Sequence, residues 1–563
     1  MSALVDQSEL AQTPVTTIRR LLSTRRHGGF DRYDMVILLL YAAILAFAIH
    51  HYLPFSDEGQ GWVMARDCSL GELLFRRLHY EGHPGLWATF LWCLCRLNVP
   101  FQAMNWIGGS IAVAGIYVFL RFSPFPRIFR YLLPFTYFLQ YQYAAVARPY
   151  VAFPLLLFTL CILFTLDRPR PRLFAVVAGI MANLSLHAAI IAGVFFLLFL
   201  FDLSRTQNLR KHRRSTSIAI AIFAALLLCA GVVSFPAPDA ATAFRPDHRI
   251  SKPHALTTKL VPEERLPASA PPLDPSFKES QGKANNDSKR FAILFQSAYT
   301  LSALFYPIAQ FNAIAGLFVV CLARWLWRRG CLRLLLPSIA AVIISTRVFV
   351  FDHHTGQFAL AMLAAMWICL ASETNRARIR IGPQWNEPVF VAVCTIVVFL
   401  QIGWTYHCIS EGARSPTDPG KATEAYLLKT FPNKRVAGFT FESVSAQPYS
   451  SKNLFANQAT PYRIWSVNLN MEQRRTEALR GNPDAVVVGV VTVGDQIIFD
   501  QIFDIDPAGT QVGKEMVRFW QQHGYVSTQR ICGTQFRRMG TSYSICEVIL
   551  KRAAAEPGFP RAN

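Results

Sequence analysis

Long apolar runs recur from residue 34 to residue 407 and constrain the fold of this chain more than any other feature. About 20 apolar residues in a helix cross the ~30 Å hydrocarbon core of a membrane. The chain is 52% hydrophobic with 43 Phe and 11 Trp, which is too apolar for a soluble protein of 563 residues. No small-residue cleavage site follows the first run, residues 34–54, so we expect it to remain as a span. We therefore predict a polytopic α-helical membrane protein of the cell (inner) membrane.

Arg clusters between the apolar runs account for the net charge of +21, so nucleic acid is not an expected partner. Basic segments face the cytoplasm in most membrane proteins, and here they are residues 1–33, 121–130, 167–172, 203–215, 324–333 and 374–380. This constraint predicts about 11 spans, over residues 34–54, 103–121, 128–146, 149–166, 172–185, 187–202, 217–235, 309–327, 334–350, 356–373 and 388–407. The N-terminus is then cytoplasmic and the C-terminal domain extracytoplasmic.

Three segments follow a special path under this topology. Residues 85–97 reach about 20 Å as a helix, too short to cross, and we expect them to lie on the outer face. Residues 172–202 must cross twice as two short helices, with a tip near Asn183–His187. Residues 291–308 are expected to form another helix on the outer surface.

The unusual polar residues of the apolar region all fall at the predicted outer boundary. Even on mild scales, a charge inside a bilayer costs roughly 2.5–3.5 kcal/mol, so such groups tend to mark function. They are Asp57, Glu58, His79, Glu81, His83, Arg148, Asn183, His187, Arg347, Asp352, His353 and His354. Their convergence from separate loops predicts an active site at the membrane surface.

Two extracytoplasmic parts complete the predicted organisation. Residues 236–290 form a loop rich in Pro, Ser, Lys and Asp, which we expect to be flexible when no ligand is bound. Residues 408–563 are expected to form a small α/β domain. Thr417-Asp418-Pro419 predicts the start of its first helix, and Cys532 and Cys546 flank a predicted hairpin turn, where an oxidising compartment would allow a disulfide. Its predicted elements are a helix at Ala422–Phe431, strands at 435–442 and 484–492, a helix near 510–523 and strands near 525–532 and 542–550.

Two short motifs lie in the first outer loop, residues 55–102. Asp57-Glu58 follows the first span directly, and His83-Pro84-Gly85-Leu86-Trp87 enters the predicted surface helix. Together they resemble the glycosyltransferase C-fold superfamily, nearest to the bacterial enzymes related to protein O-mannosyltransferases and lipid A aminoarabinose transferases. In this chain Gly85 replaces a second Pro, and the second outer loop, residues 147–150, lacks the acid of many relatives. The likeness extends more loosely, through the span pattern, over residues 34–407.

The resemblance implies a polyprenyl-phosphate sugar as donor, with transfer to a lipid, glycan or protein acceptor on the extracytoplasmic side. Asp57 is then the expected general base, and Glu58 orients the loop or helps to bind a metal. His79, Glu81 and His83 alternate in sequence, so an extended segment would put them on one side. With Asp57 nearby they could hold a divalent metal, but the spacing is not a known metal signature and favours hydrogen-bonded loop scaffolding.

The remaining candidates are expected to bind the donor or its leaving phosphate: Arg148, Tyr150, Asn183, His187, Arg347, His353 and His354. A guanidinium forms paired hydrogen bonds with phosphate, although a snorkelling interfacial side chain is the alternative for Arg148. For Asn183 and His187 the alternative is to satisfy the turn between two short helices.

These residues predict an inverting glycosyltransferase, in which cations at the outer boundary stabilise the departing polyprenyl phosphate. The alternative is a membrane transporter, or a flippase or polymerase of lipid-linked glycans. Transport is disfavoured because the charged residues cluster at one face and the spans show no repeated halves.

Overall fold

The structure is a computed structural model. It describes residues 30–205, 213–237, 297, 300–348, 352–376, 388–439, 441–458, 460, 471–493, 496–498, 519–536 and 542–553. The predicted basic N-terminus up to residue 29, the loop from residue 238 to 290 and most of the predicted helix near 510–523 lie outside the described residues.

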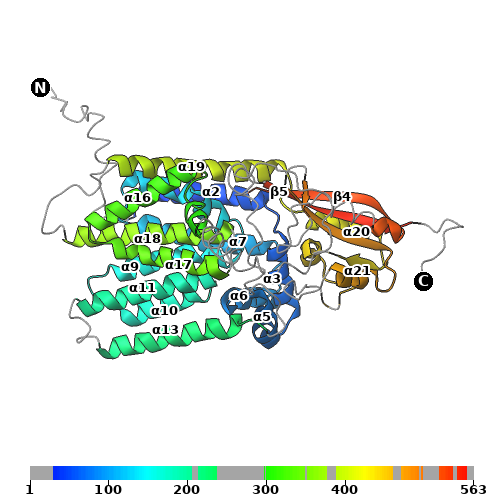
Figure 1. Ribbon diagram of the computed structural model, residues 1–563, viewed down its shortest axis with the longest axis horizontal. Helices are drawn as coiled ribbons and strands as arrows, with labels where there is room; N and C mark the ends of the chain where they lie inside the picture. The colour runs from blue at the N-terminus through cyan, green and yellow to red at the C-terminus, as the bar shows by residue number, and fades with distance from the viewer. Residues whose placement is uncertain are drawn as a thin grey trace, which may run out of the picture.

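A bundle of helices lies beside a small domain that contains a β-sheet (Figure 1). Six of the described helices are long and apolar enough to cross a membrane. They are α2 (Arg32–His51), α7 (Ala103–Phe122), α11 (Leu186–Arg205), α13 (Arg213–Ser234), α18 (Asp352–Arg376) and α19 (Pro388–Arg414). Their lengths and composition agree with the predicted class, a mostly helical protein with apolar helices long enough to span a membrane and a small C-terminal sheet.

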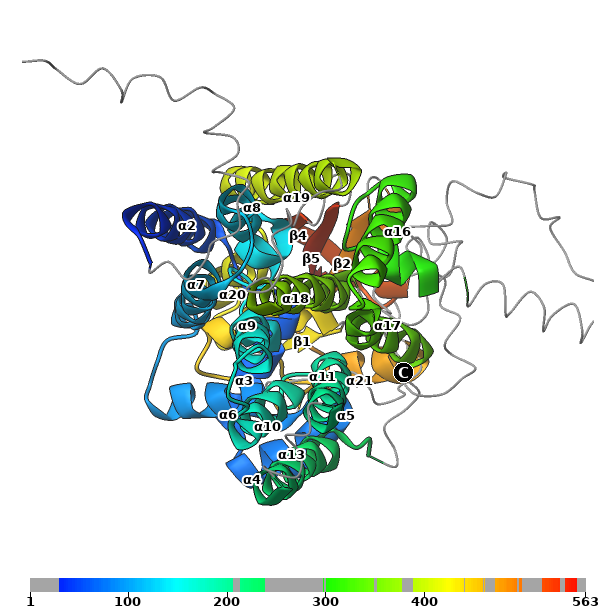
Figure 2. The same ribbon diagram turned by 90° about the vertical axis from the view of Figure 1, so that its left-hand side faces the viewer.

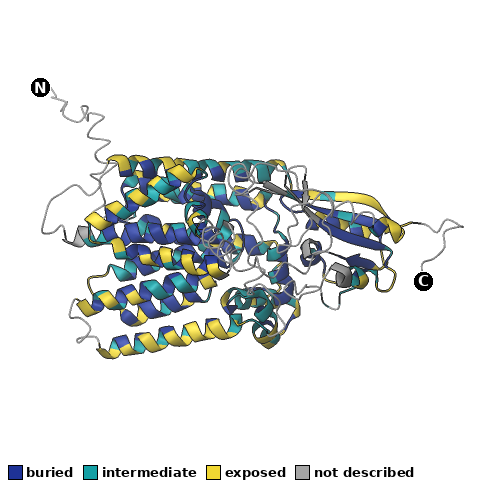
Figure 3. Cartoon of the chain, viewed as in Figure 1, coloured by how far each residue is buried: buried dark blue, intermediate teal, exposed yellow. Residues whose placement is uncertain are grey.

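The outward faces of the long helices are exposed, as the yellow ribbons of Figure 3 show, and many of the exposed residues are large and apolar. Val36 and Leu39 on α2, Leu228 on α13 and Phe399 on α19 are all more than half exposed. An apolar surface of this extent is typical of helices that face lipid. α18 is different, because its apolar stretch is 78% buried and it lies among the other helices when the bundle is seen end-on (Figure 2).

The other predicted spans are shorter or broken, so the count of about 11 stays a prediction. The predicted span 128–146 is not one continuous helix, because Pro134 has no backbone N–H to donate and interrupts it. The segment divides into α8 (Arg127–Leu132), the 3-10 turn η3 (Leu133–Phe135) and the π-helical turn η4 (Phe138–Gln142). The shorter elements are η5 (Pro149–Ala152), α9 (Phe153–Phe164), α10 (Pro171–Ala182), α16 (Asn312–Arg328), η8 (Leu332–Leu335) and α17 (Leu336–Val348). As predicted, α10 and α11 divide residues 172–202 into two helices.

Ion pairs join segments that the charge pattern assigns to one side of the membrane. Arg130 on α8 pairs with Asp34 on α2 at 3.3 Å, and both side chains are fully buried. Asp202, near the end of α11, pairs with Arg333 of η8 at 2.6 Å. Basic segments far apart in sequence therefore meet, as a common side for them requires.

The first predicted outer loop is mostly helical and lies between the bundle and the C-terminal domain (Figure 1). Its elements are α3 (Ser56–Asp67), α4 (Leu70–Glu72), the π-helical turn η2 (Leu73–Arg77), α5 (Leu78–Glu81) and α6 (Gly85–Arg96). The helix α6 matches the one expected over residues 85–97. It packs on α3 through Leu91 and Leu94, which share a buried apolar cluster with Trp62 and Phe101.

The C-terminal domain has a mixed five-stranded sheet in the order β1-β2-β5-β4, with β3 paired to β2. Only β1 and β2 are parallel among the described pairs. The disulfide that the sequence leaves open is present, between directly opposed Cys532 and Cys546. The elements are α20 (Gly420–Thr430), β1 (Val436–Gly438), the 3-10 helix η9 (Phe441–Tyr449), α21 (Met471–Leu479), β2 (Ala485–Val493), β3 (Gln496–Ile498), β4 (Tyr525–Phe536) and β5 (Ser542–Arg552).

Two details of this domain differ from the prediction. The strand expected over residues 435–442 ends at Gly438, because the chain turns into η9. Thr417 does not cap α20; its hydroxyl instead accepts from the Leu53 amide (2.6 Å) and donates to the Leu53 carbonyl (3.1 Å). Asp418 instead accepts a hydrogen bond at the start of α20, from the Gly420 amide to its carboxylate at 2.8 Å.

Candidate functional site

Asp57 and Arg148 form an ion pair at the end of the bundle that adjoins the C-terminal domain. Arg148 Nη1 lies 2.7 Å from Asp57 Oδ2, and the two side chains are 12% and 32% exposed. Asp57 lies in the first turn of α3, and Arg148 directly precedes η5. The guanidinium carbon lies 5.9 Å from the Phe55 ring centre and 6.0 Å from that of Tyr150. A carboxylate and a guanidinium thus share one partly exposed site.

Glu58, the next residue, has a different environment from Asp57. It is 2% exposed, and burial raises the pKa of its carboxyl while its hydrogen bonds oppose that rise. Its carboxylate accepts hydrogen bonds from the Tyr52 hydroxyl (2.6 Å), the Phe55 amide (3.2 Å), Asn105 Nδ2 (3.1 Å) and the Ala147 amide (2.7 Å). Glu58 therefore ties the end of α2, the start of α3, α7 and the residue before Arg148 into one unit.

A group of aromatic and imidazole rings lies next to this pair. The His187 and His354 rings stack with their centres 4.2 Å apart, and His353 meets His354 edge-on at the same distance. The Tyr150 ring centre lies 5.5 Å from His353 and 5.6 Å from His354. The Tyr143 hydroxyl donates to the His353 carbonyl at 2.6 Å, which fixes the start of α18. Three helices thus bring these candidates together at one place.

His83 interacts electrostatically with Arg148 of the ion pair and with His187 of the ring group. Burial lowers the pKa of its imidazole to about 3, and the nearby Arg148 and His187 contribute to that shift. The ring is therefore neutral at pH 7 and has both a donor and an acceptor nitrogen. A neutral imidazole here can orient a polar ligand without adding charge.

The segment that carries His79, Glu81 and His83 is not extended, so the condition for placing all three on one side is not met. Residues 78–81 form α5, and Gly82 ends that helix with a positive φ of 65°. Glycine has no Cβ and adopts this left-handed conformation without the strain other residues meet. The turn separates His83 from the two side chains on α5.

His79 and Glu81 have partners on other elements. His79 Nδ1 contacts the Phe235 carbonyl, just after α13, and Glu81 accepts a hydrogen bond from Gln60 Nε2 at 3.2 Å. These contacts suit loop scaffolding. Among the described residues, no three or more His, Cys, Asp or Glu side chains gather closely enough to hold a metal ion. The possible metal site stays a hypothesis, and the described structure does not bring its candidate ligands, Asp57, His79, Glu81 and His83, together.

Asn183 and Arg347 occupy different surroundings. Asn183 Nδ2 donates to the Gly179 carbonyl at 2.8 Å and to the Leu226 carbonyl at 2.9 Å, so it joins α10 to α13. Arg347 is exposed in the last turn of α17. Within the described part of the chain, the ion pair of Asp57 is with Arg148 and not with Arg347.

Sequence reasoning did not identify the contribution of the C-terminal domain to this region. Besides the Thr417–Leu53 hydrogen bonds, Arg66 on α3 donates to the Ser450 carbonyl at 2.7 Å. The Pro448 ring lies so close to Gly59 that a Cβ there would come within 2.8 Å of it. The domain therefore holds α3 from the side opposite the bundle.

Two buried acids lie in the same interface. Burial raises the pKa of Asp418 to about 7 and that of Glu547 to about 8, and the nearby Asp418 carboxylate adds to the rise at Glu547. The Glu58 charge contributes to the shift of Asp418. Glu547 interrupts an otherwise apolar strand, Ile545 to Leu550, which is the sequence signal that could have marked it.

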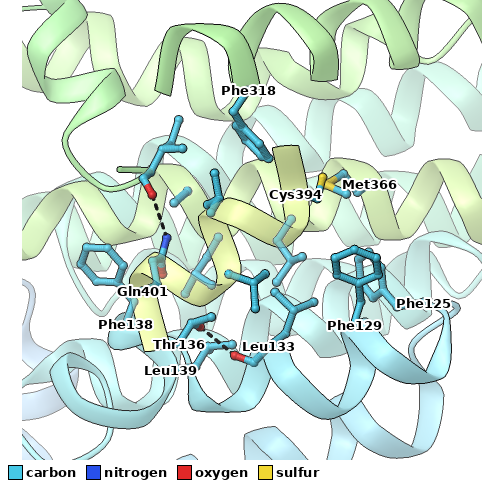
Figure 4. A pocket seen from close by; sticks show the side chains of 16 residues that line it. Phe125, Phe129, Leu133, Thr136, Phe138, Leu139, Phe318, Met366, Cys394 and Gln401 are labelled. Atoms are coloured by element: carbon cyan, nitrogen blue, oxygen red, sulfur yellow. Dashed lines mark hydrogen bonds between the residues drawn. The ribbon is translucent and has the colours of Figure 1, made fainter. Parts of the chain in front are cut away.

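A separate apolar cavity of about 90 Å³ lies deeper in the bundle, between α16, α18, α19 and residues 125–139. Its polar groups bond to backbone: Gln401 donates to the Ile308 carbonyl at 3.4 Å and Thr136 to the Leu133 carbonyl at 2.7 Å (Figure 4). Gln401 also donates to the Pro307 carbonyl at 2.9 Å. Phe138 lines the cavity and also packs on Tyr143, whose hydroxyl bonds to His353. Such a cavity suits apolar groups and offers no charge for catalysis.

No family model matches the chain, and comparison with curated proteins and with solved structures finds no significant match.

Proposed function

We propose that this protein is an inverting glycosyltransferase that moves a sugar from a polyprenyl-phosphate donor to an acceptor at the extracytoplasmic membrane surface. The observation that carries the proposal is the Asp57–Arg148 pair at the end of an apolar helix bundle. It combines a proton acceptor with a cation that suits a phosphate. The resemblance of the 55–102 loop to the glycosyltransferase C-fold superfamily adds to this reading.

In the proposed reaction, Asp57 takes the proton of an acceptor hydroxyl or amine as the acceptor attacks the sugar C1. A new bond forms to C1 while the bond from C1 to the phosphate oxygen breaks, and its electron pair goes to the phosphate. The phosphate changes from a diester with one negative charge to a monoester with two. Arg148 stabilises the charge that develops there.

The other residues bind and orient in this proposal. His83 and His354 offer imidazole nitrogens close to Arg148, and the Tyr150 ring, 6.0 Å from the Arg148 guanidinium carbon, packs on His353 and His354. His187 stacks on His354. Glu58 is a positioning residue, since its carboxylate is buried and engaged by four donors. The lipid chain of the donor remains in the bilayer.

The topology completes the proposal. With about 11 spans in the cell (inner) membrane, the basic N-terminus is cytoplasmic and the C-terminal domain extracytoplasmic. The disulfide Cys532–Cys546 supports this orientation, since disulfides persist in oxidising compartments.

The proposal is tested with the purified protein in proteoliposomes that contain a polyprenyl-phosphate sugar labelled in the sugar. Cell-envelope lipids, glycans and proteins are supplied separately as acceptors. We expect the label to leave the lipid and appear covalently on one acceptor class. Label that crosses the bilayer while still linked to its lipid would identify a flippase instead.

A further inference from the structure

In the proposed mechanism, which this inference depends on, Arg148 has two anionic partners. In the structure it pairs with Asp57 at 2.7 Å, whereas the mechanism also requires it at the donor phosphate. A guanidinium has five N–H donors in a fixed plane, so it can turn from one anion to another or bridge two of them. Which anion holds it decides whether Asp57 is available as a base.

The pair is a built feature of the fold. Glu58 accepts a hydrogen bond from the Ala147 amide at 2.7 Å, so the residue after Asp57 is bound to the residue before Arg148. This buried contact fixes the two backbones next to each other. The ion pair is therefore preformed, and side-chain rotation alone can open it.

In the described structure, Asp57 is the carboxylate that forms an ion pair with Arg148. The Glu58 carboxylate is engaged by its four donors. The imidazoles of His83 and His187 and the ring of Tyr150 add no negative charge at pH 7. Among the described residues, an incoming phosphate therefore meets Arg148 already paired with Asp57, and the two anions compete for this guanidinium.

We propose that Arg148 restrains Asp57 in the empty enzyme and is drawn to the phosphate when the donor binds, so that the donor must bind before the acceptor. The negative charge moves in the same direction during the reaction, from Asp57 to the phosphate. Asp57 loses its negative charge as it takes the acceptor's proton, and the phosphate gains one as the C1–O bond breaks. Arg148 lies between them and keeps an anionic partner throughout.

The exchange has a measurable consequence that does not need turnover. If the Asp57 carboxylate competes with the phosphate, its removal must tighten phosphate binding. The probe is polyprenyl monophosphate, the proposed product, and the measurement is its affinity for the full-length protein in nanodiscs. We expect Asp57→Asn to bind it about tenfold more tightly than the wild type, the effect of one charge-assisted contact no longer shared.

The matched control is Asp67→Asn, because Asp67 lies on the same helix and pairs with Arg66 at 2.8 Å, away from Arg148. It should leave the affinity unchanged. Arg148→Ala should weaken binding by about tenfold or more, and Asp57→Asn should have no further effect in that background, as a double-mutant cycle requires. Melting temperatures identify any variant that fails to fold.

The outcomes separate the exchange from the proposed function. If the wild type binds polyprenyl monophosphate but Asp57→Asn binds it equally or more weakly, the exchange is wrong and the glycosyltransferase proposal stands. If the wild type does not bind the lipid phosphate at all, the proposed function itself fails.

Discussion

The Glu58 carboxylate accepts a hydrogen bond from the backbone amide of Ala147 at 2.7 Å and so binds the first turn of α3 to the segment that carries Arg148. Glu58→Gln places an amide NH₂ among four donors, which leaves at least one of them unsatisfied. An unsatisfied buried polar group costs roughly 1–3 kcal/mol. We expect the melting temperature and the turnover both to fall, measured on the same preparation. Glu72→Gln, which removes a partly exposed partner of Arg77, is the control and should change neither.

Asp57→Asn should lower turnover by at least about 100-fold, since general-base catalysis contributes roughly 10²–10⁴-fold. The side chain is partly exposed, so the melting temperature should change little. Initial rates of sugar transfer at saturating donor measure the effect, and Asp67→Asn again serves as the control. Near-normal turnover in Asp57→Asn would remove this residue from the chemistry.

Thermal stability should fall as the pH rises from about 5 to above 8. The pKa of Asp418 is raised from 3.8 to about 7 and that of Glu547 from 4.5 to about 8, mainly by burial. The folded protein therefore holds protons that the unfolded chain releases. The stability associated with these two groups is complete below pH 4 and is lost as the pH passes 7 and then 8.

The variant Asp418→Asn with Glu547→Gln isolates this pH effect. Its amides do not titrate, so its melting temperature should depend less on pH between 5 and 8 than that of the wild type. Identical slopes for the two proteins would show that these acids do not carry the dependence.

Arg130→Met should destabilise the protein by about 3–5 kcal/mol, because it leaves the Asp34 carboxylate buried without its cation. Adding Asp34→Asn should recover much of that loss. The control is Arg127→Met, since Arg127 is 42% exposed and pairs with Asp31 at 3.4 Å. A surface pair contributes about 0–1 kcal/mol, so thermal or denaturant unfolding should separate the two variants clearly. Equal losses in both would contradict a buried role for the Arg130 pair.

The predictions from sequence that hold are those that depend on short stretches of chain. The apolar helices follow from length and hydropathy, and α6 and the β4–β5 hairpin follow from their own residues. The predictions that fail overlooked single residues that interrupt or end an element. Pro134 breaks a run that hydropathy alone treats as continuous, and a helix that ends at Gly82 replaces an alternating segment.

The candidate site divides in the same way. Asp57 and Arg148 are recognisable because charge at the edge of an apolar run is unusual, but their contact depends on tertiary structure. Asn183 is an uncharged polar residue at a similar edge and instead holds α10 and α13 together. Asp418 lies in a polar stretch that gives no sign of burial, so only tertiary packing, which places Gly533 of β4 against its backbone, reveals it.

The anomeric configuration of the product tests the central claim most directly. A polyprenyl-phosphate sugar of known configuration is incubated with the protein and its acceptor, and the early product is analysed by NMR before any anomeric exchange. A single displacement at C1, with Asp57 as base and the phosphate as leaving group, predicts an inverted linkage and one polyprenyl monophosphate released per sugar transferred. A retained linkage, or sugar transfer without release of polyprenyl monophosphate, would contradict it.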